Sequence, residues 1–503
     1  MITFKKAPII YLFSLFLFVS CFHDEGIYNY SEPLVIQVEG IEKQYKVSAG
    51  EVIKLHPNIY PDNRKYECFW TIAPSNAQTA EAVDTISRSK DFEYTVNKSI
   101  GAYKLRFRAK DIETGIFAYN EYLVDVTTEM ASGWWVLKGE DKETDFDFFS
   151  SLNNKKKENI LKTNGYSMKG EPLNLHFTHS FWHFDPNSQK DVLTSTVFVA
   201  STEDIVAIDY FTGQILSQYE DLFVDKPEQR NVRALFAGPS DVHVYVDNTV
   251  YTMYNSKYTI YKQFIIKTLG DYELSQHIHS TSISLPILFN QNESSFCSVS
   301  RNAPKLLSFT QGPISPNNMG MDLLFLGGKT NSAYSPGDEV FAIMKKRESE
   351  EYKLLKMEGL PYTGMQGPLI KESINLDKSL DVLHAEFKTL NQNNNIIYYS
   401  KNNKLYSCNL DTQTEDEQSI ALPADEEITY MEFLKYSPYG SDDSWFDYLV
   451  IATAKGQNYK LYLHPVNAGE VKPADKTFEG KGRVKRVCYM EQTKNGYYRT
   501  TLF

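Results

Sequence analysis

Three histidines and an aspartate in one short segment could bind a metal ion: His176, His179, His183 and Asp185. Three imidazoles can hold Zn²⁺ when they converge on one point. On a helix the three rings would share a face, but the surrounding residues favour a strand, which turns His176 away from the other two. His277 and His279 share a strand face but lack a third ligand. The sequence therefore predicts no metal site and no cofactor.

Carboxylates that could serve as a general acid and base are numerous: Asp204, Asp209, Asp241, Asp442, Asp443 and Asp447. Glycosidases need two carboxylates flanking the scissile bond. Nothing in the sequence pairs any two of these six, and all of them also suit turns. The motifs of serine hydrolases, zinc proteases, phosphate-binding loops and EF-hand calcium loops do not occur. No catalytic residue is predicted, and an enzyme is the alternative interpretation.

Aromatic side chains in one irregular segment are better candidates for ligand binding: Tyr436, Tyr439, Trp445 and Phe446. They are mixed with acids up to Asp447, in a segment too long for a tight turn. Sugars and peptides both bind to such aromatic platforms, and long loops in compact domains are often functional. The other interpretation is that these rings pack back on their own sheet. We expect the four rings to contribute to a binding face.

The scaffold for this loop is predicted from a strand–turn–strand pattern over residues 197–216. Short β-rich runs alternate there with turn residues, and Gly213 supplies the backbone freedom of a turn. A weaker copy occupies residues 396–412. Such a unit needs stacked copies to bury both faces, which indicates a β-propeller. At about 40 to 50 residues per blade, residues 133–503 would form seven or eight blades. An array of sandwiches is the structural alternative.

An immunoglobulin-like sandwich is predicted before the propeller, over residues 32–128. Trp70 lies in an alternating run typical of a central strand. In a later run, Tyr103, Leu105 and Phe107 face one way while basic residues face the other. Aromatic residues make up 14% of the chain and helical patterns are few, so we expect an all-β protein.

The N-terminus has the features of an export signal. Lys5 and Lys6 precede an apolar run too short for a comfortable membrane span. The run ends at Cys21 and resembles the lipobox of bacterial lipoproteins, although Phe18 replaces the usual Leu. We expect residues 1–21 to be a lipoprotein signal with Cys21 lipidated, and residues 22–31 to be a tether. An ordinary secretory signal with a chance cysteine is the alternative.

Two motifs extend this resemblance over most of the chain. Residues 101–107 read Gly-x-Tyr-x-Leu-x-Phe, with Asp111 following and Trp70 preceding, and residues 133–137 read Gly-Trp-Trp-Val-Leu. This order is similar to that of the PKD-like family lipoproteins of Bacteroidetes. The resemblance implies a lipid anchor, a PKD-like domain and a neighbourhood of starch-utilisation-type uptake systems. An acidic stretch after Cys21 resembles the surface-export signal of such lipoproteins; a solvated tether is the alternative.

Together these features predict an outer-membrane lipoprotein that faces the cell exterior. We expect it to bind a glycan, a peptide or a subunit of an outer-membrane transporter complex as an accessory of nutrient uptake. A surface glycoside hydrolase or lyase with its site at the propeller axis, and a structural adhesion protein, are the alternatives. The net charge of −12 argues against nucleic acid as a partner. Four further cysteines lie far apart and are expected to be buried single thiols.

Overall fold

The computed structural model describes residues 34–501 apart from short gaps. The gaps are at 49–50, 76–82, 97, 99–100, 187–188, 256–257, 259–261, 282, 310–311, 333–334, 360, 362–367, 421, 437–445 and 493–497. The chain divides into two compact units, Met1–Val126 and Thr127–Phe503. The predicted signal segment, its Cys21 and the tether lie outside the described residues. No helix among the described residues is long and apolar enough to cross a membrane.

The first unit is a β-sandwich around Trp70. Its larger sheet has the order β2-β9-β8-β5-β6, and β3 pairs with β7 and β1 with β4. The Trp70 ring is fully buried and lies 4.5 Å from Phe92 and 4.4 Å from Phe107, measured between ring centroids. The strands are β1 (Gln37–Glu39), β2 (Gln44–Ser48), β3 (Val52–Leu55), β4 (Asn58–Tyr60), β5 (Tyr66–Pro74), β6 (Asp84–Ser87), β7 (Phe92–Thr95), β8 (Gly101–Asp111) and β9 (Phe117–Thr127).

The second unit contains seven antiparallel sheets within the described residues. One sheet contains β14 (Pro172–Asp185), β15 (Lys190–Ser201), β16 (Ile205–Asp209) and β17 (Ile215–Ser217), and the next contains β18 (Val232–Gly238), β19 (Asp241–Val246), β20 (Thr249–Tyr254) and β21 (Ile266–Thr268). The third contains β22 (Leu288–Asn290), β23 (Ser295–Ser298) and β24 (Leu307–Ser308). The fourth contains β25 (Met321–Ser332), β26 (Ser335–Lys346), β27 (Tyr352–Glu358) and β28 (Ile370–Leu376).

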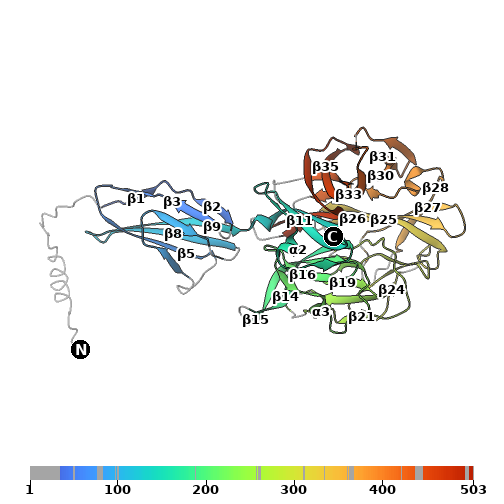
Figure 1. Cartoon of the computed structure of the whole chain (residues 1–503), viewed down its shortest axis with the longest axis horizontal. Coiled ribbons are helices and arrows are strands. Elements are labelled where there is room, and N and C mark those ends of the chain that lie inside the picture. The colour runs from blue at the N-terminus through green and yellow to red at the C-terminus, as the bar shows by residue number, and fades with distance from the viewer. Residues whose placement is uncertain are drawn as a thin grey trace, which may run out of the picture. The chain divides into compact units, whose positions relative to one another are not determined.

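The other three sheets complete the unit. The fifth contains β29 (Lys388–Leu390), β30 (Ile396–Lys401), β31 (Lys404–Asn409) and β32 (Thr414–Glu417). The sixth contains β33 (Glu427–Tyr436), β34 (Phe446–Lys455), β35 (Asn458–Asn467), β36 (Glu470–Val471) and β37 (Lys476–Lys481). The last contains β10 (Ser132–Glu140), β11 (Glu143–Ser150), β12 (Lys156–Lys157) and β13 (Met168–Lys169) together with β38 (Arg483–Gln492) and β39 (Tyr498–Thr500). In Figure 1 the colour passes through these sheets in chain order, from teal at β11 to red at β35.

The last of these sheets closes the ring, because it combines the two ends of the unit. β10 pairs with β38 in antiparallel register, with Trp135 opposite Cys488. The first strands also contact one another in sequence: β38 contacts β14, β14 contacts β18, β25 contacts β29, β29 contacts β33 and β33 contacts β38. A closed ring of sheets leaves no long free edge on the unit. This closure distinguishes a propeller from the array of sandwiches.

Seven apolar clusters fill the spaces between consecutive sheets, and the alternation of strand side chains builds them. On β10, Trp134 joins the cluster shared with β33–β35, whereas Trp135 joins the cluster shared with β14–β16. Val197 and Phe198 of β15 divide in the same way between the two neighbouring sheets. Each sheet is therefore apolar on both faces, as a propeller blade must be, and the predicted all-β fold with an Ig-like domain and a propeller is confirmed.

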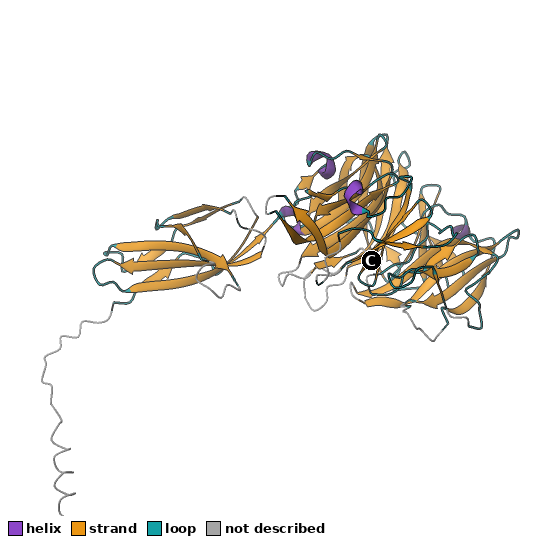
Figure 2. Ribbon diagram, turned by 90° about the horizontal axis from the view of Figure 1, so that it is seen from below, coloured by secondary structure: helices purple, strands orange, loops and turns teal. Residues whose placement is uncertain are grey.

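Helices are few and short, as Figure 2 shows. Within the described residues they are the 3-10 turns η3 (Glu129–Ala131) and η4 (Asp381–Leu383) and the helices α2 (Ile160–Thr163) and α3 (Tyr219–Leu222). The predicted turn before Gln214 forms as expected: the Asp209 carboxylate accepts bonds from the backbone N–H groups of Phe211 and Thr212 at 2.9 and 2.8 Å. Gly213 has a φ of +73°, and a Cβ there would lie 2.5 Å from Ile160.

Candidate functional site

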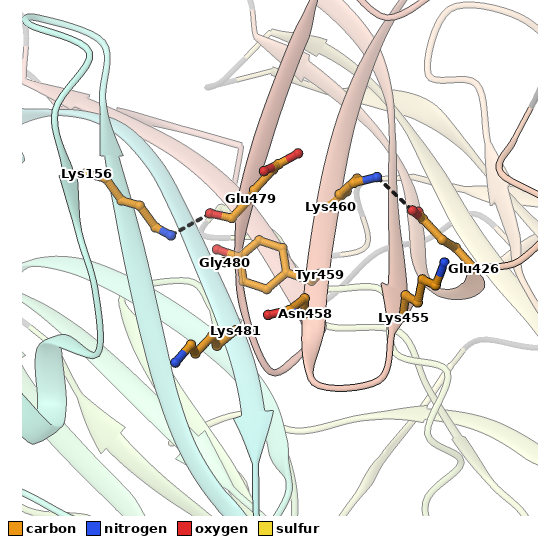
Figure 3. A pocket seen from close by; sticks show the side chains of 9 residues that line it. All are labelled: Lys156, Glu426, Lys455, Asn458, Tyr459, Lys460, Glu479, Gly480 and Lys481. Carbon is orange, nitrogen blue, oxygen red and sulfur yellow. Dashed lines mark hydrogen bonds and ion pairs between the residues drawn. The ribbon is translucent and has the colours of Figure 1, made fainter.

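A pocket of about 700 Å³ opens between the closing sheet and the sheet that precedes it. Figure 3 shows charged side chains from both sheets around it. Lys156 comes from β12, Lys455 from the end of β34 and Asn458 from the start of β35. The lining residues are Lys156, Glu426, Lys455, Asn458, Tyr459, Lys460, Glu479, Gly480 and Lys481.

Ion pairs hold most of the lysine side chains of this pocket in place. Lys460 Nζ lies 2.8 Å from Glu426 Oε1, and Lys455 pairs with Asp425. These partners raise the pKa of both lysines, so both carry a positive charge at neutral pH. Lys156 Nζ donates to the backbone oxygen of Glu479 at 2.5 Å.

The Lys481 side chain is exposed and makes no hydrogen bond or ion pair among the described residues. Its charge acts on Glu158 from a distance. The pocket is lined by lysines and by no arginine. Such a lining suits the recognition of polar groups by charge. A nucleophilic lysine needs a lowered pKa, which is the opposite of what Lys455 and Lys460 show.

A buried polar network lies beneath the pocket and joins the two sheets. Asp147 of β11 is completely buried, and its carboxylate lies 2.9 Å from Lys138 Nζ of β10. Tyr459 of β35 donates its hydroxyl to the same carboxylate at 2.7 Å. A Cβ at Gly480 would lie 2.5 Å from the Tyr459 ring, so the glycine lets that ring cross β37. Burial, and then the charge of Asp147, raises the pKa of Tyr459, which remains a hydroxyl donor.

The segment of three histidines forms β14, a strand, as predicted. His179 is exposed, whereas His183 is buried and its Nε2 lies 2.9 Å from Thr194 Oγ1. Burial lowers the pKa of His176 to about 4. Among the residues that the structure describes, no three His, Cys, Asp or Glu side chains are placed to hold a metal ion.

The candidate carboxylates have local partners. Asp204 accepts a bond from the Tyr166 hydroxyl at 2.8 Å, and Asp241 lies 2.8 Å from Arg301 Nη1. Asp447 accepts a bond from Asn393 at 2.7 Å. Asp209 holds its turn, and Asp442 and Asp443 lie outside the described residues. None of the four described carboxylates is paired with another of them.

A further polar group, which sequence reasoning missed, lies where β33 contacts β38. Glu432 Oε2 is 2.6 Å from Arg486 Nη1, and Tyr430 donates its hydroxyl to the same carboxylate. Burial raises the pKa of Tyr430. The arginine therefore neutralises this carboxylate. No local sequence signal could have indicated the pair, because its members lie 54 residues apart.

The aromatic loop is described only at its base. Tyr436 at the end of β33 is 1% exposed, and its hydroxyl donates to Glu491 at 2.7 Å. Phe446 is half-buried and stacks on Tyr436 with centroids 5.2 Å apart. Tyr439 and Trp445 lie outside the described residues. For Tyr439 and Trp445, a role in ligand binding stays a prediction. For Tyr436, direct contact with a ligand would require its ring to leave its buried position against Phe446.

The four cysteines of the described residues are buried and unbridged: Cys68, Cys297, Cys408 and Cys488. Burial raises the pKa of the Cys408 thiol to about 12, so it stays protonated and unreactive at neutral pH. The described cysteines therefore act as small apolar side chains of the core.

One family model matches part of the chain. The sequence model of the PKD-like family matches residues 21–172. No curated protein matches the chain. Among solved structures, a quinonprotein alcohol dehydrogenase-like protein from Bacteroides thetaiotaomicron is 11% identical with a TM-score of 0.38, covering 88% of this chain and 96% of that one.

Two other solved structures are similar at the same low level. Dihydro-heme d1 dehydrogenase NirN, in complex with DHE, is 7% identical with a TM-score of 0.38, covering 83% of this chain and 74% of that one. The Cps50 (Swd1) β-propeller domain of Myceliophthora thermophila is 10% identical with a TM-score of 0.32, covering 65% and 98%. Similarities this weak carry no functional argument, and the fold assignment rests on the seven sheets described above.

Burial of His243 on β19 predicts stability that is lost in acid. Burial, and then the charges of His176 and Arg301, lowers the pKa of His243 from 6.5 to about 3. The folded state accepts only the neutral ring, so this contribution is complete above pH 6.5 and is lost as the pH falls towards 3. In His243→Gln, the free energy of unfolding should depend less on pH between these values, by up to about 1.4 kcal/mol per pH unit. Urea titrations at several pH values measure the slope.

The exposed His384 provides the control for this prediction. His384→Gln should leave the slope of the wild-type protein unchanged. If His243→Gln and the wild type had the same slope, His243 would not be the group that takes up the proton on unfolding.

Proposed function

We propose that this protein is a surface-exposed outer-membrane lipoprotein that binds a glycan, a peptide or a partner subunit as an accessory of a nutrient-uptake system. The observation that carries the binding role is the open pocket between the closing sheet and β35–β37. Its charged groups come from two sheets, and ion pairs already hold most of them in place. Ligand binding would therefore cost little side-chain conformational entropy. The anchor is supported by the signal-like segment that ends at Cys21.

A binding screen with matched variants tests this role. The soluble chain that begins after Cys21 is offered to immobilised glycans, peptides and outer-membrane extracts. Lys481→Ala and Lys455→Ala should weaken the interaction that the screen detects, because both remove an ammonium group from the pocket. Lys404→Ala, an exposed lysine of β31 paired with Glu417, is the control. Equal binding by all three variants would contradict the pocket's role.

The loop between β33 and β34 is proposed to add Tyr439 and Trp445 to the binding face, with Tyr436 and Phe446 fixing its base. If Trp445 stacks on the ligand, Trp445→Ala should weaken binding by about 1–3 kcal/mol, as for buried aromatic anchors. It should leave the melting temperature almost unchanged. Calorimetric titration and thermal melts of this variant measure both effects.

A core position for Trp445 would give the opposite pattern. The same substitution would then cost about 3–5 kcal/mol of folding stability. Unchanged binding together with such a loss would overturn the proposed role of the loop.

A further inference from the structure

The outer face of the larger sheet of the first unit carries a hollow of about 390 Å³. Arg108 on β8 lies at its centre, because the strand register places Phe69 of β5 and Tyr119 of β9 directly opposite it on either side. Phe117 and Tyr119 are each 52% exposed. The hollow is lined by Phe69, Thr71, Thr85, Arg106, Arg108, Phe117 and Tyr119.

Two arginines of this face stack on aromatic rings, one exposed and one half-buried, without a carboxylate partner. The guanidinium carbon of Arg108 lies 4.2 Å from the centroid of Phe117, and that of Arg88 lies 5.0 Å from the centroid of Phe69. Neither makes an ion pair among the described residues, whereas the neighbouring Arg106 is 3.0 Å from Glu121. Stacking uses one face of a guanidinium and leaves its in-plane N–H donors free.

The chemistry of these groups defines a ligand. Fixed guanidinium groups bind planar carboxylates through two parallel hydrogen bonds. Exposed rings bind the apolar faces of sugars, and the hydroxyls of Thr71 and Thr85, which pair across β5 and β6, can bond to sugar hydroxyls. A peptide main chain is recognised at the edge of a sheet, but this hollow lies on the face of paired strands.

We propose that this hollow binds an acidic polysaccharide, with Arg108 and Arg88 pairing its uronate carboxylates and the rings supporting its sugars. The first unit then has a binding function of its own. The site is in a different compact unit from the pocket beside Lys481, so either site can be lost without the other.

Calorimetric titration of the whole soluble chain with polygalacturonate tests the proposal. Arg108→Gln should raise the Kd by about tenfold or more, as expected for loss of a charge-assisted hydrogen bond. Arg108→Lys should not restore binding, since an ammonium cannot form the bidentate pair. Phe117→Ala should also weaken binding, and circular dichroism checks that each variant folds.

Two controls separate this site from general charge effects. Lys54→Gln removes the same charge from the other sheet of the sandwich, where Lys54 pairs with Glu93 at 3.1 Å. Lys404→Gln removes it from the propeller, at an exposed lysine outside the pocket that pairs with Glu417. Both should bind polygalacturonate like the wild type, and neutral dextran should not bind.

The following outcomes would overturn the proposal. They are absence of polygalacturonate binding, equal binding by Arg108→Gln, or loss of binding in Lys481→Gln alone. Equally tight binding of poly-glutamate through Arg108 would identify an acidic-peptide site, and preference for dextran sulfate would identify a sulfate site. Either result would replace the uronate assignment.

Discussion

Lys138→Met is expected to lower the free energy of unfolding by about 3–5 kcal/mol, because it removes the nearer and fully buried cation of the Asp147 carboxylate. Lys138 is 1% exposed and Asp147 is 0% exposed, so water cannot replace the lost partner. Two hydrogen bonds to Asp147 remain, from Tyr459 at 2.7 Å and from the backbone of Asn159 at 3.0 Å. Lys156 Nζ, at 4.0 Å and partly exposed, is too distant to replace the contact made by Lys138. Urea or guanidinium unfolding at neutral pH measures the loss.

Two further variants show whether burial is the cause. Lys404→Met breaks an exposed pair with Glu417 and should cost far less stability than Lys138→Met, because water screens an exposed pair. The double variant Lys138→Met/Asp147→Leu removes both charges and should recover much of the stability lost in Lys138→Met. A single-variant cost as small as that of Lys404→Met would mean that the pair is solvated in solution.

Cys21→Ser is expected to release the protein from the membrane almost completely. The sequence predicts that the lipid on Cys21 is its anchor, and no helix among the described residues could replace it. Labelling of cells with a lipid precursor, followed by membrane fractionation, measures both the modification and the anchoring. Surface protease treatment of intact cells then tests whether the anchored protein faces the exterior.

The control for this variant is a cysteine that cannot be the anchor. Cys68→Ser changes a buried thiol of the sandwich and should remain lipidated and membrane-bound, provided that it folds. Equal retention of Cys21→Ser and the wild type would contradict lipidation. Release of the wild type into the medium would support the ordinary secretory signal instead.

The sequence alone indicated several of the segments that become strands. Continuous apolar runs, as in residues 197–200 and 205–208, indicate strands that are buried on both faces. Gly213 indicates the turn after them. Trp70 and the alternating run at residues 101–111 defined the sandwich. These features are local, because strand and turn preferences depend on neighbouring residues along the chain.

Only the tertiary structure decided which side chains meet. The closure of β10 on β38, the Lys138–Asp147–Tyr459 network and the Glu432–Arg486 pair join residues far apart in sequence, and no local pattern encodes such pairings. The same holds for the loop aromatics: ring type and spacing gave Tyr436 and Trp445 the same prediction, yet the fold packs Tyr436 against Phe446. Likewise, Arg108 became a candidate ligand only when strand register placed it between Phe69 and Tyr119.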